Sequence, residues 1–254
     1  MSQAHHPDFT AFGAIEKTCQ VMREEFKFFA IIIVLYALVS SFPFLFYSGL
    51  DFANLAEVME RMNYVQSNNL AISLINYSVV SFLIINILDR TNANLNNYSV
   101  KEYPYVERAL YSFIPVSLIF IISWILITLG LVLLIVPGLI VIAGLYLATP
   151  LKLAENVNFI SALQKSWVLS KGHRLSIWGV ILLPLIPILI IFFILNFIIT
   201  GIFISTAVTE ITIIATATVY ALITGTISVF MLTASGVVYH QISNEVIDEE
   251  MPFN

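Results

Sequence analysis

One group of side chains in this 254-residue chain combines residue types and spacing that suit ligand binding. Lys165, Trp167, Lys171 and Arg174 lie within one short segment. Tryptophan favours the membrane–water interface, and clustered bases near a bilayer attract anionic lipid headgroups. The pattern therefore indicates contact with phospholipid headgroups or with a partner. The alternative is that these bases only anchor the neighbouring membrane spans on one side.

Catalytic chemistry has no comparable support in the sequence. Glu210 and His240 lie near the ends of an apolar run, and no cluster of histidine and glutamate has the spacing of a metal site. Cys19 is the only cysteine, which excludes an internal disulfide. No serine has a histidine placed to act as its base. We therefore predict a protein that is not an enzyme, without catalytic, metal-binding or cofactor-binding residues and without a cofactor.

The composition shows what kind of elements must position these residues. Hydrophobic residues make up 59% of the chain and charged residues 11%, with a mean hydropathy of +0.93. A soluble domain carries about 25% charged residues and about half apolar ones. This chain has too few charges to solvate the surface of a soluble protein. We predict an all-α polytopic transmembrane helix bundle.

Six apolar runs are long enough to be membrane spans, because a helix needs about 20 apolar residues to cross the hydrocarbon core. Their approximate bounds are 28–47, 69–88, 111–132, 137–151, 176–201 and 209–239. The third and fourth come from one continuous run at 111–151, which is about twice the length of one span. The segment Gly130–Gly138, which ends in Pro137 and Gly138, is therefore predicted to form a structural turn that folds this run back on itself.

The distribution of basic residues predicts the orientation of the spans. Six spans put both termini on one side of the membrane. The N-terminal segment and the segments after the second and fourth spans hold three, three and four basic residues, which is 10 of the 11 in the chain, and only Arg61 lies on the other side. Lysine and arginine are enriched in cytoplasmic segments. We therefore expect both termini to be cytoplasmic.

Two segments outside the spans have the pattern of amphipathic helices. In residues 1–27 an apolar face recurs at helical spacing and comprises Phe9, Phe12, Ile15, Cys19, Met22 and Phe26. Such a helix lies in the interface, where it braces the first span or binds a partner. Cys19 is expected to be a packing residue, with palmitoylation as the alternative. A second helix is expected at 156–171, within a six-helix transmembrane domain at 28–240. Residues 241–254 are expected to be an acidic, disordered tail.

Polar and small residues inside the spans have two interpretations. Ser73, Tyr77 and Ser81 are spaced four apart, as are Ala217 and Gly225 with Ala221 between them. Small residues at this spacing allow close helix packing, and hydroxyl groups can form hydrogen bonds across the contact. The alternative is a polar lining for a lipid or solute pathway.

The stretch at 129–175 contains a characteristic series of motifs. It comprises an apolar run into Val136-Pro137-Gly138, then Pro150 and Glu155, and then a helix with Ala162, Leu163 and Ser166 before a basic end. This pattern resembles the YciC-like uncharacterised bacterial inner-membrane proteins, which are related to the membrane domain attached to some glycerophosphodiester phosphodiesterases. The segment 22–33 resembles the family's entry into its first span. The resemblance implies a multi-pass protein of the bacterial inner (cytoplasmic) membrane and carries over no catalytic residues.

We therefore expect a non-enzymatic integral inner-membrane protein that acts as a scaffold, assembly partner or accessory subunit of a membrane complex. The expected partners are membrane lipids, through anionic headgroups at the cytoplasmic face, and a membrane protein or a second copy of the chain; no nucleic acid is expected. The alternative is a transporter or permease-like subunit for a lipid or other amphiphile. In that case the helix at 156–171 would act as a coupling helix, although it lacks the Ala-Ala and glycine spacing of importer permease loops.

Overall fold

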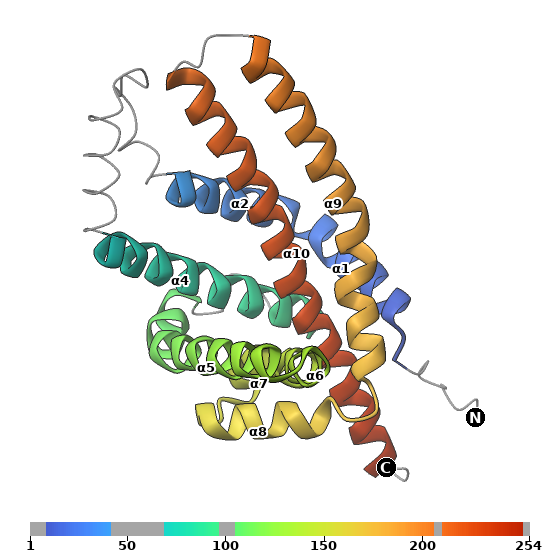
Figure 1. Ribbon diagram of the computed structural model, residues 1–254. Helices are drawn as coiled ribbons and strands as arrows, with labels where there is room; N and C mark the ends of the chain where they lie inside the picture. The colour runs from blue at the N-terminus through green and yellow to red at the C-terminus, as the bar shows by residue number, and fades with distance from the viewer. Residues whose placement is uncertain (1–8, 42–68, 97–104, 206–209, 251–254) are drawn as a thin grey trace. The chain divides into compact units, whose positions relative to one another are not determined.

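The computed structural model describes residues 9–41, 69–96, 105–205 and 210–250, and this part of the chain is helical and contains no strands (Figure 1). The helices are α1 (Ala11–Glu24), α2 (Phe26–Ser41), α4 (Asn69–Leu95), α5 (Tyr105–Leu133), α6 (Ile135–Leu145), α7 (Ala148–Glu155), α8 (Phe159–Leu169), α9 (Arg174–Ser205) and α10 (Glu210–Glu250). The all-α prediction is confirmed for these residues. Arg61, the one base expected on the opposite side of the membrane, lies outside them.

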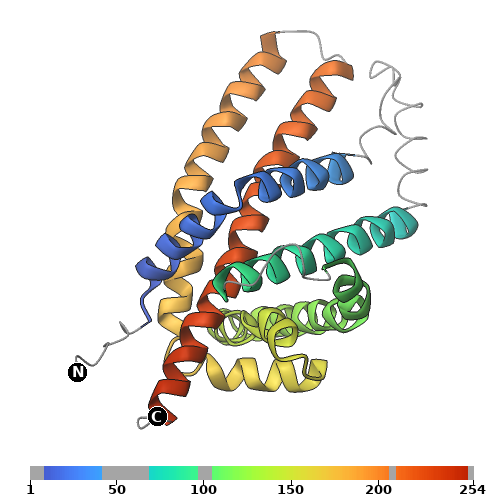
Figure 2. The same ribbon diagram turned by 180° about the vertical axis from the view of Figure 1, so that it is seen from behind.

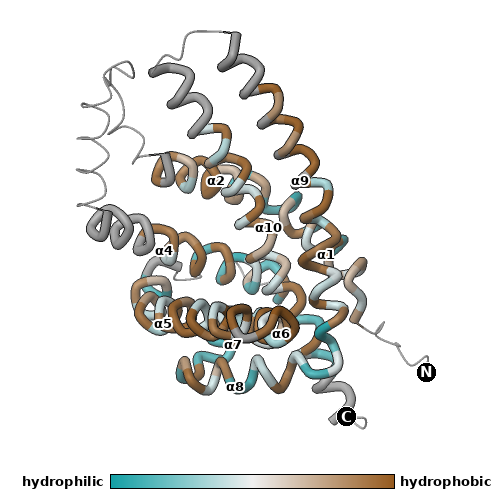
Figure 3. Tube along the Cα trace, in the orientation of Figure 1, coloured by the Kyte–Doolittle hydropathy of each residue, from teal (hydrophilic) through white to brown (hydrophobic). Residues whose placement is uncertain are grey.

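Within the described residues, four helical stretches are long and apolar enough to cross a membrane. They are Glu107–Val132, Ile135–Glu155, Arg174–Leu195 and Thr218–Glu245. Many of their large apolar side chains are exposed, among them Trp124, Ile135 and Phe193, and hydrophobic residues cover most of α5, α6 and α9 (Figure 3). Soluble monomers rarely expose contiguous apolar surface on this scale. These helices are compatible with an integral membrane protein.

The chain divides into two compact units that share several helices. The first unit comprises Met1–Phe26, Ile84–Pro184 and Phe230–Asn254, and the second comprises Lys27–Leu83 and Leu185–Val229. The first unit therefore holds α1, the C-terminal part of α4, α5 to α8, the start of α9 and the C-terminal part of α10. Hydrophilic residues are frequent in the C-terminal part of α4 (Figure 3), where Asp89, Arg90 and Asn92 lie.

The long apolar run reverses at Leu134, between α5 and α6. Pro137 lies in the first turn of α6, where its missing N–H is not needed for the helix. Gly130 and Gly138 face each other at the reversal, since a Cβ built on Gly130 would lie 2.9 Å from Cα of Gly138. The two glycines allow the backbones of α5 and α6 to approach closely.

A second break separates α6 from α7 at Tyr146 and Leu147. Pro150 cannot donate a backbone hydrogen bond to Tyr146, four residues earlier, so the helix cannot continue regularly through this point. The Tyr146 hydroxyl donates to the main-chain oxygen of Met231 at 2.9 Å, which joins this break to α10. α7 ends at Asn156, whose φ of 51° lies in the left-handed region.

Small residues of α10 pack in the second unit. Ala221 and Gly225 are buried. A Cβ built on Gly225 would lie 2.9 Å from Cδ1 of Tyr36 on α2, so the glycine allows close contact between these helices. Ser73 and Tyr77, the polar residues expected to share a face with Ser81, lie outside the residues whose side chains are described.

Two expectations from the sequence are wrong. α10 continues to Glu250, so residues 241–250 are helical and do not form a disordered tail. Ile242 has no exposed surface and extends the packed face of α10 into this segment. Cys19 was expected to pack, but it is exposed, because α1 turns Ala14, Thr18 and Val21 toward the protein instead.

Candidate functional site

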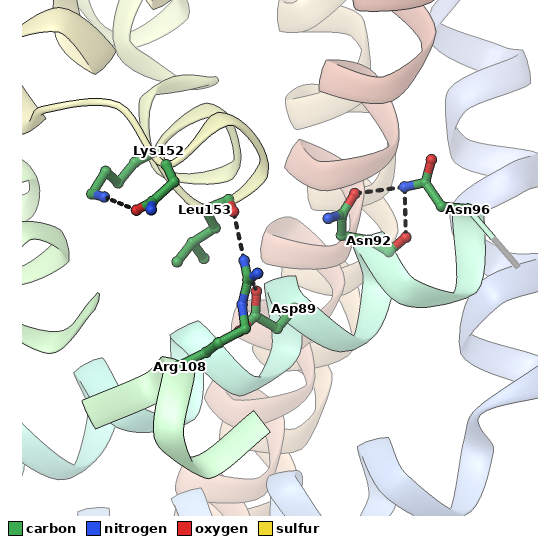
Figure 4. Close-up of polar contacts among 7 residues, drawn as sticks. Asp89, Asn92, Asn96, Arg108, Lys152 and Leu153 are labelled. Carbon is green, nitrogen blue, oxygen red and sulfur yellow. Dashed lines mark hydrogen bonds and ion pairs between the residues drawn. The ribbon is translucent and has the colours of Figure 1, made fainter. Parts of the chain in front are cut away.

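The first unit contains a buried carboxylate paired with an arginine. Asp89 lies in α4, one residue beyond the apolar run at 69–88, and it has no exposed surface. Nη2 of Arg108, near the start of α5, lies 3.4 Å from Oδ1 of Asp89 and donates to the main-chain oxygen of Leu153 at 2.8 Å (Figure 4). Leu153 is in the last turn of α7, where a cation is favoured by the helix dipole. Arg108 therefore links α4, α5 and α7.

Burial dominates the electrostatics of Asp89. Loss of water around the carboxylate raises the pKa of Asp89 to about 6, although the charge of Arg108 and its hydrogen bond act in the opposite direction. Oδ2 of Asp89 has no hydrogen-bond partner among the described residues. The carboxylate is therefore held in place through one oxygen, by one arginine.

A second buried base lies on α7. Lys152 is 5% exposed, and Nζ donates to the side-chain oxygen of Asn156 at 3.0 Å (Figure 4). No carboxylate in the described parts of the chain forms an ion pair with Lys152. A buried ammonium with a neutral partner makes the surrounding region electropositive.

Glu155 connects three helices at the end of α7. One carboxylate oxygen pairs with Lys165 of α8 at 2.5 Å, and the other accepts a hydrogen bond from the Tyr239 hydroxyl of α10 at 3.1 Å. Lys165 belongs to the predicted ligand-binding group, and Glu155 belongs to the segment that resembles the YciC-like proteins. The structure pairs these two residues with each other. The charge of Glu155 is balanced within the protein.

α1 is attached to α4 by a further ion pair. Arg90 donates from Nε to Glu25 at 2.9 Å and also from Nη2, and both side chains are largely buried. Asn94 donates to Glu24 at 3.2 Å. Hydrogen bonds from Gln20 and Asn94 lower the pKa of Glu24, which remains a carboxylate at neutral pH.

A polar pocket of about 370 Å³ opens beside these pairs. Its described lining consists of Asn92, Asn96, Arg108, Ala154, Tyr239, His240, Ser243 and Asn244. Asn92 of α4 and Asn96, just after the end of α4, are held together, since Nδ2 of Asn96 donates to the main-chain and side-chain oxygens of Asn92 at 2.8 Å (Figure 4). His240 and Asn244 are in contact on α10, with 3.3 Å between Nδ1 and Nδ2. The pocket thus combines a guanidinium with neutral hydrogen-bonding groups.

The structure divides the ligand-binding residues predicted from the sequence. The guanidinium of Arg174 stacks on the Trp167 ring, 4.4 Å from its centroid. The Trp167 ring also packs on the backbone of α6 at Gly144. Lys171 is exposed, whereas Lys165 is bound to Glu155. Only Trp167 and Arg174 are therefore brought into direct contact with each other.

The polar pocket was not predicted from the sequence. Asp89 and Arg108 flank the segment between two predicted spans, but nothing in the spacing indicates that they pair. Lys152 was counted only as a base that orients the spans, although it is buried. The one available signal was the charge of Asp89 immediately after an apolar run, since ionisable residues at the edge of a span often have a partner.

Comparison of the chain with models of protein families, with curated proteins and with solved structures finds no match.

Proposed function

We propose that this protein is a non-enzymatic scaffold or accessory subunit of a membrane complex. In this proposal it crosses the bacterial inner membrane six times, with both termini in the cytoplasm. The observation that carries the proposal is the use of charged side chains to join helix ends. Such a network suits a rigid platform for partners.

The network joins helices that are distant in the sequence. Glu25 and Arg90 connect α1 with α4, and Arg108 connects α4 and α5 with α7. Glu155 connects α7 with α8 and α10. In these three ion pairs, the base and the carboxylate come from different parts of the chain.

Apolar residues on α1 and α8 offer contact surfaces for this role. Phe12 and Phe26 are 74% and 69% exposed, and Ile160 and Val168 of α8 are also exposed. Exposed apolar side chains on amphipathic helices suit the lipid interface or a membrane-protein partner. Lys171 adds a charge that favours anionic headgroups. The resemblance to the YciC-like proteins agrees with an inner-membrane location.

The topology can be tested with an impermeant thiol reagent on intact cells that express a Cys19→Ser variant. A cysteine replacing Glu210 is expected to react from outside, whereas one replacing Lys171 is expected to react only after the cells are opened. Reaction at Lys171→Cys in intact cells, with none at Glu210→Cys, would reverse the proposed orientation.

The scaffold role can be tested by crosslinking in the native membrane, mild extraction and native mass spectrometry. We expect one or more membrane proteins, or a second copy of the chain, to remain bound in a fixed ratio. An exposed-face variant, Phe12→Asp with Val168→Asp, should lose this partner, while Gln164→Asp should keep it. A wild-type chain recovered as a monomer without crosslinks would contradict the proposal.

A second candidate is a transporter subunit for an amphiphile. It is favoured by a mostly apolar pocket of about 280 Å³ between α5, α6, α7 and α10, whose lining includes Phe120, Trp124 and Met231. A pocket of this kind can hold an acyl chain. Transport of a fluorescent phospholipid in proteoliposomes, blocked by Ser123→Trp but not by Leu126→Trp, would favour this function over a scaffold.

A further inference from the structure

The polar pocket is lined almost entirely by polar side chains. Of its described lining residues, only Ala154 is apolar, and none carries a carboxylate. Three asparagine amides, a serine and a tyrosine hydroxyl, and a histidine supply donors and acceptors in several directions. Groups of this kind recognise a small polar molecule with hydroxyl or ester oxygens. Its volume of about 370 Å³ is near the lower end of the range for small-molecule pockets.

The charge near the pocket favours an anion. Arg108 lines it, and Lys152 of α7, which is not among the described lining residues, lies close enough to Arg108 for the two positive charges to repel each other. Asp89 is bound to Arg108 and Glu155 to Lys165, so each of these carboxylates is already matched by a base. Lys152 has no described carboxylate partner. The five charged residues of this group are Arg108, Lys152, Lys165, Asp89 and Glu155, and together they carry one excess positive charge. An anion in the pocket would balance it.

Arg108 is held in position to meet this anion. Its Nη2 is bound to Asp89 and to the main-chain oxygen of Leu153, which fixes the guanidinium at the edge of the pocket. The side chain keeps 37% of its surface exposed. A planar guanidinium in a fixed orientation is well suited to phosphate, because several of its N–H groups can donate to phosphate oxygens at once.

We propose that the polar pocket binds a phosphate ester with a small polar substituent. The phosphate lies against Arg108, and the substituent lies among the amides and hydroxyls of α4 and α10. The same chemistry is present in the headgroup of a glycerophospholipid and in a soluble phosphate ester. This site is independent of the scaffold role, so failure of either proposal leaves the other standing.

The test uses the full-length protein in detergent and two phosphate probes. Binding of sn-glycerol 3-phosphate is measured by calorimetry, with glycerol as the phosphate-free comparison. Retention of added phosphatidylglycerol is measured by native mass spectrometry, with diacylglycerol as the comparison. The wild type is expected to bind at least one phosphate probe in preference to its phosphate-free counterpart.

The first variant places a charge in the pocket without removing the buried ion pair. Ser243→Asp is expected to weaken phosphate binding by about tenfold or more, because its carboxylate repels the ligand. Gln164→Asp adds the same charge at an exposed position of α8 outside the pocket lining, and it is expected to change binding by less than about threefold. If the Arg108→Gln variant folds, it should also lose phosphate binding. If it does not fold, the Ser243→Asp variant alone decides the test.

The outcomes separate the two sources and can overturn the proposal. Binding of glycerol 3-phosphate alone assigns the pocket to a soluble phosphate ester, and binding of phosphatidylglycerol alone assigns it to a lipid headgroup. The proposal is overturned if the wild type prefers neither phosphate probe over its counterpart. It is also overturned if Ser243→Asp binds as the wild type does, or if Gln164→Asp loses binding to the same extent as Ser243→Asp.

Discussion

The guanidinium of Arg108 lies 3.4 Å from the carboxylate of Asp89. Arg108 keeps part of its side chain exposed to solvent, whereas Asp89 has no exposed surface. The two residues differ in how much water they lose. Asp89 loses all of its hydration, whereas Arg108 keeps part of its own. The attraction between them therefore only partly offsets the desolvation of the carboxylate, which is why the pKa of Asp89 is raised to about 6 despite the adjacent cation.

This pair predicts a pH dependence of stability. A folded-state pKa above the unfolded value means that the folded protein binds the proton more tightly, so the stabilisation is complete below about pH 4 and is lost as pH rises through about 6. A rise of about two pKa units corresponds to about 3 kcal/mol. We expect the Tm of the protein in detergent to fall between pH 4.5 and 7.5 through this group.

Asp89→Asn isolates that contribution, because an amide resembles the protonated acid at every pH. The variant should lose the part of the fall in Tm that belongs to Asp89 and should melt at or above the wild-type temperature at pH 7.5. Glu107→Gln removes an exposed carboxylate next to Arg108 in the sequence and should leave the wild-type pH profile intact. A steep profile retained by Asp89→Asn would contradict the assignment.

The link between α1 and α4 gives a second prediction. Glu25 accepts two hydrogen bonds from Arg90 in a largely buried setting. A hydrogen bond to a charged group contributes about 1.5–3 kcal/mol, so Glu25→Gln should let α1 detach more often from the first unit. Hydrogen–deuterium exchange of the α1 amides should then accelerate by about tenfold or more.

Glu16→Gln is the matched control for this change. Glu16 lies on the same helix but is exposed, and its loss should leave exchange in α1 unchanged. Equal exchange in the Glu25→Gln and Glu16→Gln variants would show that the ion pair does not hold α1 in place.

The helical class was predictable because long apolar runs are a local feature of the sequence. Apolar runs of sufficient length predict helices wherever lipid is the solvent, and the reversal at Leu134 falls within the proline- and glycine-containing segment expected to turn. The helical extension of α10 to Glu250 does not follow from composition, because the acidic residues at 241–254 favour a solvated tail, whereas Ile242 is buried. One buried residue can continue a helix that its charged neighbours would not support alone.

The polar pocket was not predictable in the same way. Arg108 is 19 residues from Asp89 and 45 residues from Leu153 in the sequence, and these groups meet only through the packing of α4, α5 and α7. The burial of Lys152 has the same origin. Counting bases on one side of a membrane treats all of them as solvated, so the count cannot distinguish an exposed Lys171 from a buried Lys152.

Gly172 gives a third prediction, which concerns the loop between α8 and α9. Its φ of 88° is unfavourable for other residues, and a Cβ there would meet no atom within 4 Å. Gly172→Ala should therefore destabilise the protein through backbone strain alone, by about 1 kcal/mol. Gly172→Asn should cost less, because asparagine tolerates left-handed conformations. A higher Tm for the Gly172→Ala variant than for the Gly172→Asn variant would contradict this explanation.

The contact between Gly144 and Trp167 gives the fourth prediction. A Cβ built on Gly144 would lie 2.4 Å from Cε3 of the Trp167 ring, and Ser166 donates to the main-chain oxygen of Gly144 at 2.7 Å. Gly144→Ala should push α8 away from α6 and strain both contacts, with a cost of about 1–3 kcal/mol. The measurements are the Tm in detergent and the rate at which a protease cleaves in α8.

A double-mutant cycle distinguishes this steric clash from a general effect on α6. Trp167→Leu removes the ring that the new methyl group would strike, so Gly144→Ala should cost much less in that background than in the wild type. Ser161→Ala, on α8 but without a described contact to Gly144, should give no such relief. If Gly144→Ala lowers the Tm equally in both backgrounds, the Trp167 ring does not determine how closely α8 approaches α6. The glycine would then be required by the backbone of α6 alone.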